Sequence, residues 1–203
     1  MKPIANGTAR SYRSELRARQ ADETRVRILD ATVRAMAGGI ASVSIPVVAR
    51  EAGVAVPTIY RHFRTKRDLL AAVYPHLVGR AGLDDVVVPR SVDDLRRGVH
   101  AIFDRLESFD DLARAAMASP AVAEARRISM PDRLAMTRQL ADSIVPRLSE
   151  VDRKRIARLL VILTASSALR MWRDQLGATV DEAADDVDWL VRAAIGAAAK
   201  AEP

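Results

Sequence analysis

Residues 49–63, AREAGVAVPTIYRHF, constrain the fold of this chain more than any other stretch. Where two short helices cross closely, the first needs a small residue at the crossing, and the turn needs a residue that tolerates positive φ. Ala49 and Gly53 stand at the spacing that meets both requirements. Ile59 and Phe63 share the inner face of a second helix that begins near Pro57. The stretch therefore predicts a helix-turn-helix.

The outer face of this second helix carries polar and basic side chains, which suit contacts with a nucleic acid. Thr58 and Arg61 point outward, and Tyr60 and His62 lie at the edges. Arg61 is the predicted base reader, because a guanidinium can pair bidentately with guanine. A phosphate contact or a solvated side chain is the alternative for Arg61. Tyr60 is expected to contact a phosphate or, alternatively, to fill the wedge between the helices.

The charge of the chain is concentrated near its beginning. Residues 1–76 hold 13 Lys and Arg against 6 Asp and Glu, a net charge of +7, and residues 77–203 hold 19 against 20, a net charge of −1. Such asymmetry indicates that the first region faces a polyanion. Lys66 and Arg67 also stand in the first turn of a helix, where the macrodipole disfavours cations. A bound phosphate would explain their position, as would simple solvation.

The remaining patterns are helical, so the predicted fold class is all-α. A flexible basic arm (1–21) precedes a three-helix DNA-binding domain (22–78) and a helical regulatory and dimerisation domain (79–203). Ser44, Thr65 with Asp68, and Thr179 with Glu182 are predicted caps. The first helix is expected over 22–37, and a linker over 79–91 contains a buried loop at 86–88. Further helices are expected over 91–108, 110–118, 121–129, 131–148, 149–176 and from 179 onward.

Composition and motifs exclude several other classes of protein. The 203 residues include no cysteine, which excludes disulfides and thiolate sites. No secretory signal opens the sequence, and the longest uncharged helical stretch, Leu159–Leu169, has 11 residues, so a cytoplasmic protein without a membrane span is expected. No phosphate loop, G-x-S-x-G or H-E-x-x-H motif is present, and the histidines lack metal-ligand spacing. We predict no enzyme activity, no cofactor and no metal.

The stretch Leu159–Leu169 is apolar or small around much of a helix, so it needs cover on more than one side. A second copy of the chain can supply that cover through a four-helix bundle across a twofold axis. An intramolecular core is the alternative. The residues predicted at the dimer interface are Leu159, Leu163, Ser167, Val187, Leu190, Val191, Ala194 and Ile195.

The sequence SIPVVAREAGVAVPTIYRHFRTKRDLL resembles the DNA-binding signature of TetR-family transcriptional regulators, and the likeness covers about residues 22–74. It departs from the family pattern at Pro46 and Val47, which affects expected backbone contacts of the preceding helix. The resemblance implies that the helix at 57–63 enters a major groove. With Arg10 and Arg13 as candidate minor-groove contacts, the DNA-binding residues are Ser44, Val56, Pro57, Thr58, Tyr60, Arg61, His62, Lys66, Arg10 and Arg13.

The resemblance also implies a homodimer on a palindromic operator and a small-molecule pocket among the middle helices. Candidate pocket residues are Phe103, Leu106, Met117, Met130, Leu134 and Met136, which are equally ordinary core residues. The predicted function is a ligand-responsive regulator, a repressor released from double-stranded DNA by a small-molecule effector. A non-specific or architectural DNA-binding protein is one alternative, and a helical enzyme or carrier with a vestigial first domain is another.

Overall fold

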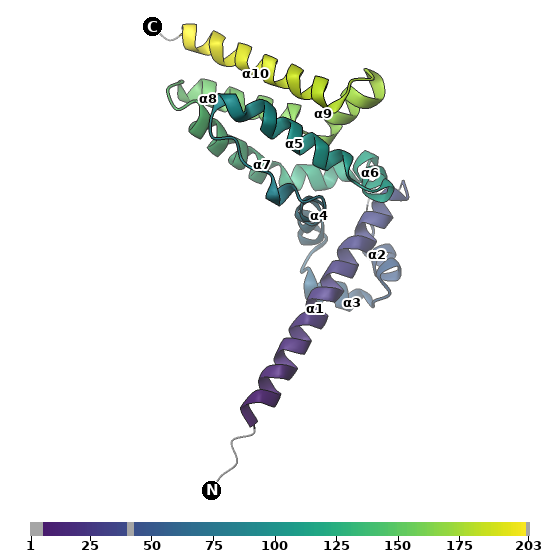
Figure 1. Ribbon diagram of the computed structural model, residues 1–203. Helices are drawn as coiled ribbons and strands as arrows, with labels where there is room; N and C mark the ends of the chain where they lie inside the picture. Colours follow the sequence, from purple (N-terminus) through teal and green to yellow (C-terminus); the bar gives the residue numbers. More distant parts are fainter. Residues whose placement is uncertain (1–5, 40–42, 202–203) are drawn as a thin grey trace.

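The computed structural model describes residues 6–39 and 43–201, with side chains from Glu15 onward except Asp84. Every regular element in these residues is helical, which confirms the predicted all-α fold class. Figure 1 shows the helices in two groups, with α4 between them. The α-helices are α1 (Asn6–Ala37), α2 (Ile45–Ala52), α3 (Val56–His62), α4 (Lys66–Arg80), α5 (Leu95–Glu107), α6 (Asp111–Ala118), α7 (Val122–Ile144), α8 (Glu150–Leu163), α9 (Ser166–Arg170) and α10 (Val180–Ala201). Short 3₁₀ turns form η1 (Leu83–Asp85) and η2 (Val92–Asp94), and η3 (Met171–Gln175) is π-helical.

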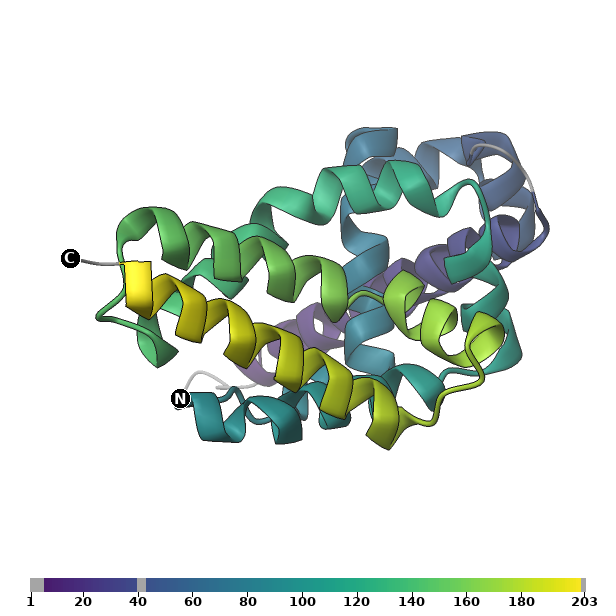
Figure 2. The same ribbon diagram turned by 90° about the horizontal axis from the view of Figure 1, so that it is seen from above.

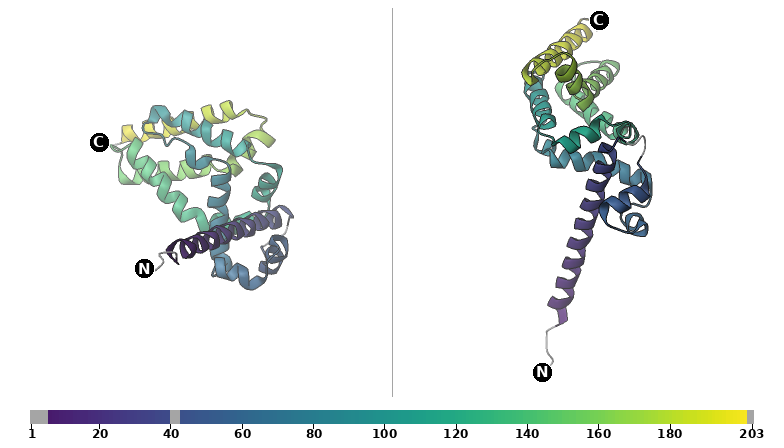
Figure 3. Two further views of the ribbon diagram at one scale, coloured as in Figure 1. Left: turned by 60° about the horizontal axis from the view of Figure 1, so that its bottom comes forward. Right: turned by 90° about the vertical axis from the view of Figure 1, so that its right-hand side faces the viewer.

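The first helix begins far earlier than predicted, at Asn6 rather than Asp22. The residues between these positions are mostly Ala, Arg, Glu, Gln, Leu and Ser, and neither proline nor glycine occurs from Thr8 to Ala37. Nothing in this segment stops a helix that the following apolar residues already hold in place. In Figure 3, α1 stands out from the rest of the molecule as a long rod. Its predicted end is correct, because Gly39 has a φ of 76° and terminates the helix.

The helix-turn-helix forms as the sequence predicts. Gly53 adopts a φ of 64°, and the N–H of Val54 donates to the carbonyl of Ala49 at 3.0 Å. Ile59 and Phe63 are buried in the first apolar core with residues of α1 and α4. The Thr65–Asp68 capping box is present at the start of α4, and the Thr179–Glu182 box precedes α10. Ser44 occupies the N-cap position of α2, but its hydroxyl makes no capping hydrogen bond.

Two predicted boundaries in the second region are wrong. Pro131 lies inside the continuous helix α7 instead of separating two helices. The ring is exposed, so water can reach the carbonyl that loses its hydrogen bond, while buried residues on both sides of Pro131 hold the helix together. Conversely, the single helix predicted over 149–176 is interrupted at Thr164 and Ala165. The Thr164 hydroxyl donates to the carbonyl of Leu160 at 2.7 Å, and Ala165 is extended.

The linker before α5 does not bury its valines. Val87 is 79% exposed and Val88 is 63% exposed, so the predicted buried loop is wrong. Pro89 makes the contact instead, because a Cβ placed on Gly98 of α5 would lie 2.5 Å from the Pro89 ring. Val87 and Val88 therefore stay in solvent, while Pro89 packs against α5. The helix predicted to begin at Ser91 also begins later. Ser91 precedes the 3₁₀ turn η2, and α5 begins at Leu95.

Two large apolar cores organise the described part of the molecule, and Ile144, Val145 and Leu148 form a third, smaller one. The first joins α1–α4 with buried residues of α6 and the beginning of α7, among them Ala113, Ala116 and Met117. The second joins α5, α8, α9 and α10 with the end of α7, around Phe103, Leu160 and Val187. Figure 2 shows α10 lying along α8 in the second group. Within the described residues, no helix combines the length and the apolar character that crossing a membrane requires.

Candidate nucleic-acid interface and helical-domain cavity

Helix α3, the second helix of the helix-turn-helix, presents a polar face to solvent. Ile59 is fully buried, whereas Pro57 and Arg61 are exposed and Val56, Thr58 and His62 are partly buried. Tyr60 is 47% exposed, which fits an outward contact and does not fit the wedge-filling alternative. The apolar inner face thus fixes the orientation of the outer one.

Exposed arginines occur on α3 and on the segments directly before and after it. Arg50 on α2, Arg61 on α3, Arg64 in the following turn and Arg67 on α4 are all exposed. Within the described part of the chain, none of the four lies within ion-pair distance of a carboxylate. A cluster of exposed cations without carboxylate partners raises the local positive potential and attracts a polyanion.

Arg25 of α1 fixes the end of the recognition helix. Its guanidinium lies 4.3 Å above the centre of the Phe63 ring and donates to the carbonyl of His62 at 3.4 Å. Partial burial lowers the pKa of His62, and the nearby charges of Arg61 and Arg25 lower it further against the opposing effect of Asp22. His62 therefore favours the neutral form at neutral pH. Sequence reasoning missed Arg25 because no local spacing links α1 to a residue so far along the chain.

Lys66, the predicted phosphate contact, already has a partner in the structure. Its Nζ lies 3.0 Å from Oε2 of Glu124, in the first turn of α7. Both side chains are partly exposed, so a phosphate could compete with the carboxylate. The contact joins the start of α4 directly to the second region, and the sequence contained no signal for it.

The remaining predicted DNA contacts are less well defined. Ser44 is partly buried at the start of α2. Arg10 and Arg13 belong to the α1 backbone, but their side chains lie outside the described residues.

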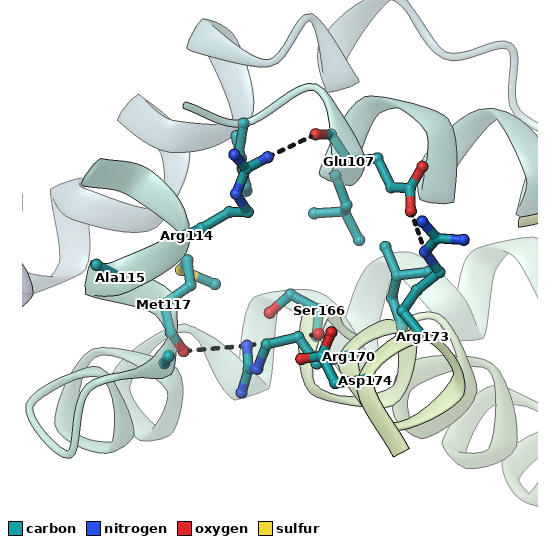
Figure 4. Close-up of a pocket in the computed structure, with 12 residues that line it drawn as sticks. Glu107, Arg114, Ala115, Met117, Ser166, Arg170, Arg173 and Asp174 are labelled. Atoms are coloured by element: carbon teal, nitrogen blue, oxygen red, sulfur yellow. Dashed lines mark hydrogen bonds and ion pairs between the residues drawn. The ribbon is translucent and has the colours of Figure 1, made fainter. Parts of the chain in front are cut away.

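A cavity of about 550 Å³ lies between α5, α6, α9 and η3. Of the six residues predicted for a pocket, Leu106 and Met117 line it, whereas Phe103 is enclosed in the second core. Met130, Leu134 and Met136 do not line it, and Leu134 and Met136 are exposed. The predicted pocket residues were all apolar, whereas part of the cavity wall is charged. The charged lining residues are drawn in Figure 4: Glu107, Arg114, Arg170, Arg173 and Asp174.

The cavity wall contains acids, arginines and Ser166 but no histidine. Among the described residues, no group of three or more His, Asp or Glu side chains is arranged to hold a metal ion.

The residues predicted at the dimer interface lie on α8, α9 and α10, and two of them are already buried within the protomer. Val187 and Val191 are fully buried within the protomer, because that side of α10 packs against α5. Leu159, Leu163, Ala194 and Ile195 are partly buried, and Ser167 and Leu190 are exposed. The largest exposed apolar side chains on these helices are two that the prediction omitted, Ile162 at 64% and Trp189 at 71% exposure.

Together these features define a helix-turn-helix protein whose second helical region contains a cavity open to solvent. Comparison with known proteins places the class more narrowly: residues 28–73 match the family model described as "Bacterial regulatory proteins, tetR family". The resemblance to the TetR family is thereby confirmed, and the chain has the fold of TetR-family transcriptional regulators.

Several solved structures share this fold at low sequence identity. A TetR transcriptional regulator from Rhodococcus sp. RHA1 is 22% identical, with a TM-score of 0.53 over 90% of this chain and 97% of that one. NalD, described as the secondary repressor of the MexAB-OprM multidrug efflux pump in Pseudomonas aeruginosa, is 19% identical, with a TM-score of 0.53 over 86% of this chain and 96% of that one. A TetR-family regulator from Streptomyces coelicolor is 19% identical, with a TM-score of 0.50 over 88% and 83% of the two chains. The comparison with curated protein sequences gives no match.

Proposed function

We propose that this chain is a DNA-binding transcriptional regulator that binds a palindromic operator as a homodimer and is released by a small molecule. The observation that carries the proposal is the set of exposed arginines without carboxylate partners on α2, on α3 and directly after α3, whose inner face is buried in the first core. Repression is the proposed direction of regulation, because one protein of the same fold is described as a repressor.

In this proposal α3 enters the major groove. Arg61 reads a base, and Thr58, Tyr60 and His62 contact the edges of the groove or the backbone. Arg50 on α2, Arg64 in the turn after α3 and Arg67 on α4 are exposed and would contact phosphates. Arg25 acts as a positioning residue, because it holds the end of α3 against α1.

Dimerisation would cover the exposed apolar side chains of α8 and α10. One short recognition helix reads few bases, whereas two related by a dyad read a palindrome. A second copy of the chain would remove apolar surface of Ile162, Trp189 and Leu190 from water.

The dimer proposal is tested by replacing Trp189 with glutamate and measuring the mass by sedimentation equilibrium. We expect the wild type to be a dimer at micromolar concentration and Trp189→Glu to be a monomer. Val87→Glu is the matched control, because Val87 is equally exposed but lies in the linker. A wild-type monomer, or a Trp189→Glu dimer as stable as the control, would contradict this interface.

The cavity is the proposed effector site, and α6 connects it to the DNA-binding region. Met117 and Ala118 of α6 line the cavity, while Ala113 and Ala116 of the same helix pack into the first core with α1. A ligand that binds one position of α6 better than another would shift α1, and with it the recognition helices, between two states.

The central experiment selects bound sequences from random DNA with the full chain. The selected operator and a random duplex are then compared over a salt series. We expect a palindrome, and an affinity for it at least a thousandfold above that for random DNA, in the range of about 10³–10⁷ that specific regulators show. Equal affinities with the same salt dependence would favour the alternative of non-specific DNA binding.

A further inference from the structure

Three arginines without an acidic partner lie at or near the cavity wall, and one of them, Arg170, lines the cavity. Arg126 and Arg133 belong to α7 and Arg170 to α9, and all three are partly buried. Throughout the described residues, no carboxylate is recorded within ion-pair distance of any of them. These arginines differ in burial from the exposed ones around α3.

The acceptors that hold these guanidinium groups are mostly neutral backbone oxygens. Arg126 donates to the carbonyl of Met117 at 3.1 Å and to the hydroxyl of Ser166 at 3.0 Å. Arg170 donates to the same Met117 carbonyl at 3.3 Å and to the Ser166 carbonyl at 3.5 Å. Two cations thus share one carbonyl oxygen, and most of the five donors on each guanidinium have no protein acceptor.

Arg133 completes the cluster from its other side. It donates to the carbonyl of Val161 at 3.5 Å, and its guanidinium lies 5.3 Å from the centre of the Tyr74 ring. Burial lowers the pKa of Arg126, and the positive charges of Arg170 and Arg133 lower it further. Partly buried like charges repel one another and are stabilised when an anion joins them.

The acids on the cavity wall do not supply that anion. Glu107 forms an ion pair with Arg173, and Arg114 pairs with Asp111 at 2.5 Å. Figure 4 shows the Glu107–Arg173 pair away from the bond between Arg170 and the Met117 carbonyl. Asp174 also lines the cavity, but it is exposed and has no recorded ion pair in the described residues.

We propose that the cavity binds a small molecule with a carboxylate head and an apolar body. The head pairs with Arg170 of the cavity wall, and the charge of Arg126, which shares the Met117 carbonyl with Arg170, adds to the attraction. Leu106, Phe109 and Leu169 supply the apolar wall for the body. The inference deepens the proposed function, on which its regulatory meaning rests, by naming the chemical class of the effector. A carboxylate would compete with the Met117 carbonyl for both arginines and so release the end of α6, the helix that packs against α1.

Binding is measured on the full chain by calorimetry, without DNA. The probes are a panel of aliphatic and aromatic carboxylic acids of eight to twelve carbons, their primary amides, and inorganic phosphate. We expect at least one acid to bind roughly tenfold or more tightly than its amide, because hydrogen bonds to a charged partner are the stronger ones. Inorganic phosphate alone should bind far more weakly, since it lacks the apolar body.

Variants then locate the head group. Arg170→Met should remove the preference for acid over amide while the amide binds as before, and Arg170→Lys should retain part of that preference. Arg127→Met is the control, because Arg127 is exposed on α7 next to Arg126. The circular dichroism melting curve shows whether Arg170→Met folds. If it does not fold, the inference is judged from the ratio of acid to amide affinity in the wild type and in Arg170→Lys.

Three results would overturn the inference: no acid in the panel binds, amides or phosphate bind as tightly as acids, or Arg170→Met weakens acid and amide equally. A negative calorimetry result does not affect the operator selection, because that experiment uses no ligand. Failure of DNA binding likewise leaves the calorimetry unaffected, so the two proposals fail separately.

Discussion

The helix-turn-helix region and the second helical region use arginine in opposite ways. Around α3 the arginines are exposed and have no carboxylate partner within the described residues, so their charge is available to a ligand. In the second helical region, from Leu83 onward, most arginines that make side-chain hydrogen bonds or ion pairs are paired with a carboxylate of the same chain. Arg96 pairs with Asp181 and Asp185, Arg192 with Asp93 and Asp188, and Arg138 and Arg153 share Asp142.

The difference teaches that net charge alone does not mark a binding surface. The near-neutral second region still contains Arg126 and Arg170, which lack acids and are partly buried. Exposed unpaired cations suit a polyanion that arrives from solvent, whereas partly buried ones suit a small anion that can enter a cavity.

The backbone differs as well. In the first region, the inner face of α3 is buried in a continuous core, and the capping box of α4 follows directly after it. In the second, the helix break at Thr164–Ala165 and the π-helical turn at Met171–Gln175 lie on either side of α9, beside the cavity. Single π-helical turns occur frequently at functional sites, which agrees with a regulatory role for this part of the chain.

The largest effect should come from the apolar anchor of the recognition helix. Phe63 is 2% exposed in the first core, so Phe63→Ala should lower the free energy of unfolding by about 3–5 kcal/mol. Urea denaturation measures the change, and Tyr60→Phe on the exposed face should leave stability nearly unaltered. If Phe63→Ala lowers the free energy of unfolding by much less than this, the first core does not anchor α3 as argued.

The next effect separates base reading from phosphate contact. Arg61→Ala should weaken binding to the selected operator by about 1–3 kcal/mol and affect random DNA much less, because a bidentate base contact carries sequence information. Fluorescence anisotropy on both duplexes measures this, with the exposed Arg127→Ala of α7 as the control. An equal loss on both duplexes would assign Arg61 to a phosphate.

A smaller effect probes the contact between the two regions. Glu124→Gln should free Lys66 for a phosphate and raise the operator affinity about two- to fivefold, since an exposed ion pair contributes at most about 1 kcal/mol. The slope of log affinity against log salt should steepen by about 0.9, the value for one added phosphate contact. Asp132→Asn, an exposed acid further along α7, is the matched control. If Glu124→Gln and Asp132→Asn have the same operator affinity and the same salt dependence, the proposed phosphate contact of Lys66 is contradicted.

The smallest effect concerns pH. The folded state lowers the pKa of His62 from its ordinary value of 6.5, so the unfolded chain binds the proton more tightly. The contribution of His62 to stability is therefore lost as pH falls through 6.5 toward the lowered pKa. Between pH 7.5 and 5.5, the urea midpoint of His62→Gln should fall less than that of the wild type. A His100→Gln variant serves as the comparison, and an equal or larger fall in His62→Gln would contradict the lowered pKa.

The sequence predicted the first region well because its determinants are local. Gly53 sets the turn, Thr65 and Asp68 cap α4, and Ile59 and Phe63 fix which side of α3 is buried. Each of these depends on residues within a few positions of one another, where helical geometry relates spacing to structure.

The second region was predicted less accurately because its determinants are not local. Whether Pro131 ends a helix depends on what packs beside it, and whether Val191 faces a partner depends on where α5 lies. The apolar pattern of α10 identified a buried stripe, but it could not separate the side facing α5 from the side that carries Trp189.

Taken by itself, the sequence determined an all-helical chain, a helix-turn-helix, its outward arginine and the concentration of positive charge near the beginning. Only the tertiary structure decided that Arg25 clamps α3, that Glu124 engages Lys66, and that Arg126 and Arg170 meet at one carbonyl beside a cavity. The physical reason is distance along the chain. Helix periodicity and caps act within a few residues, whereas these contacts join helices whose relative positions are set only when the two cores pack.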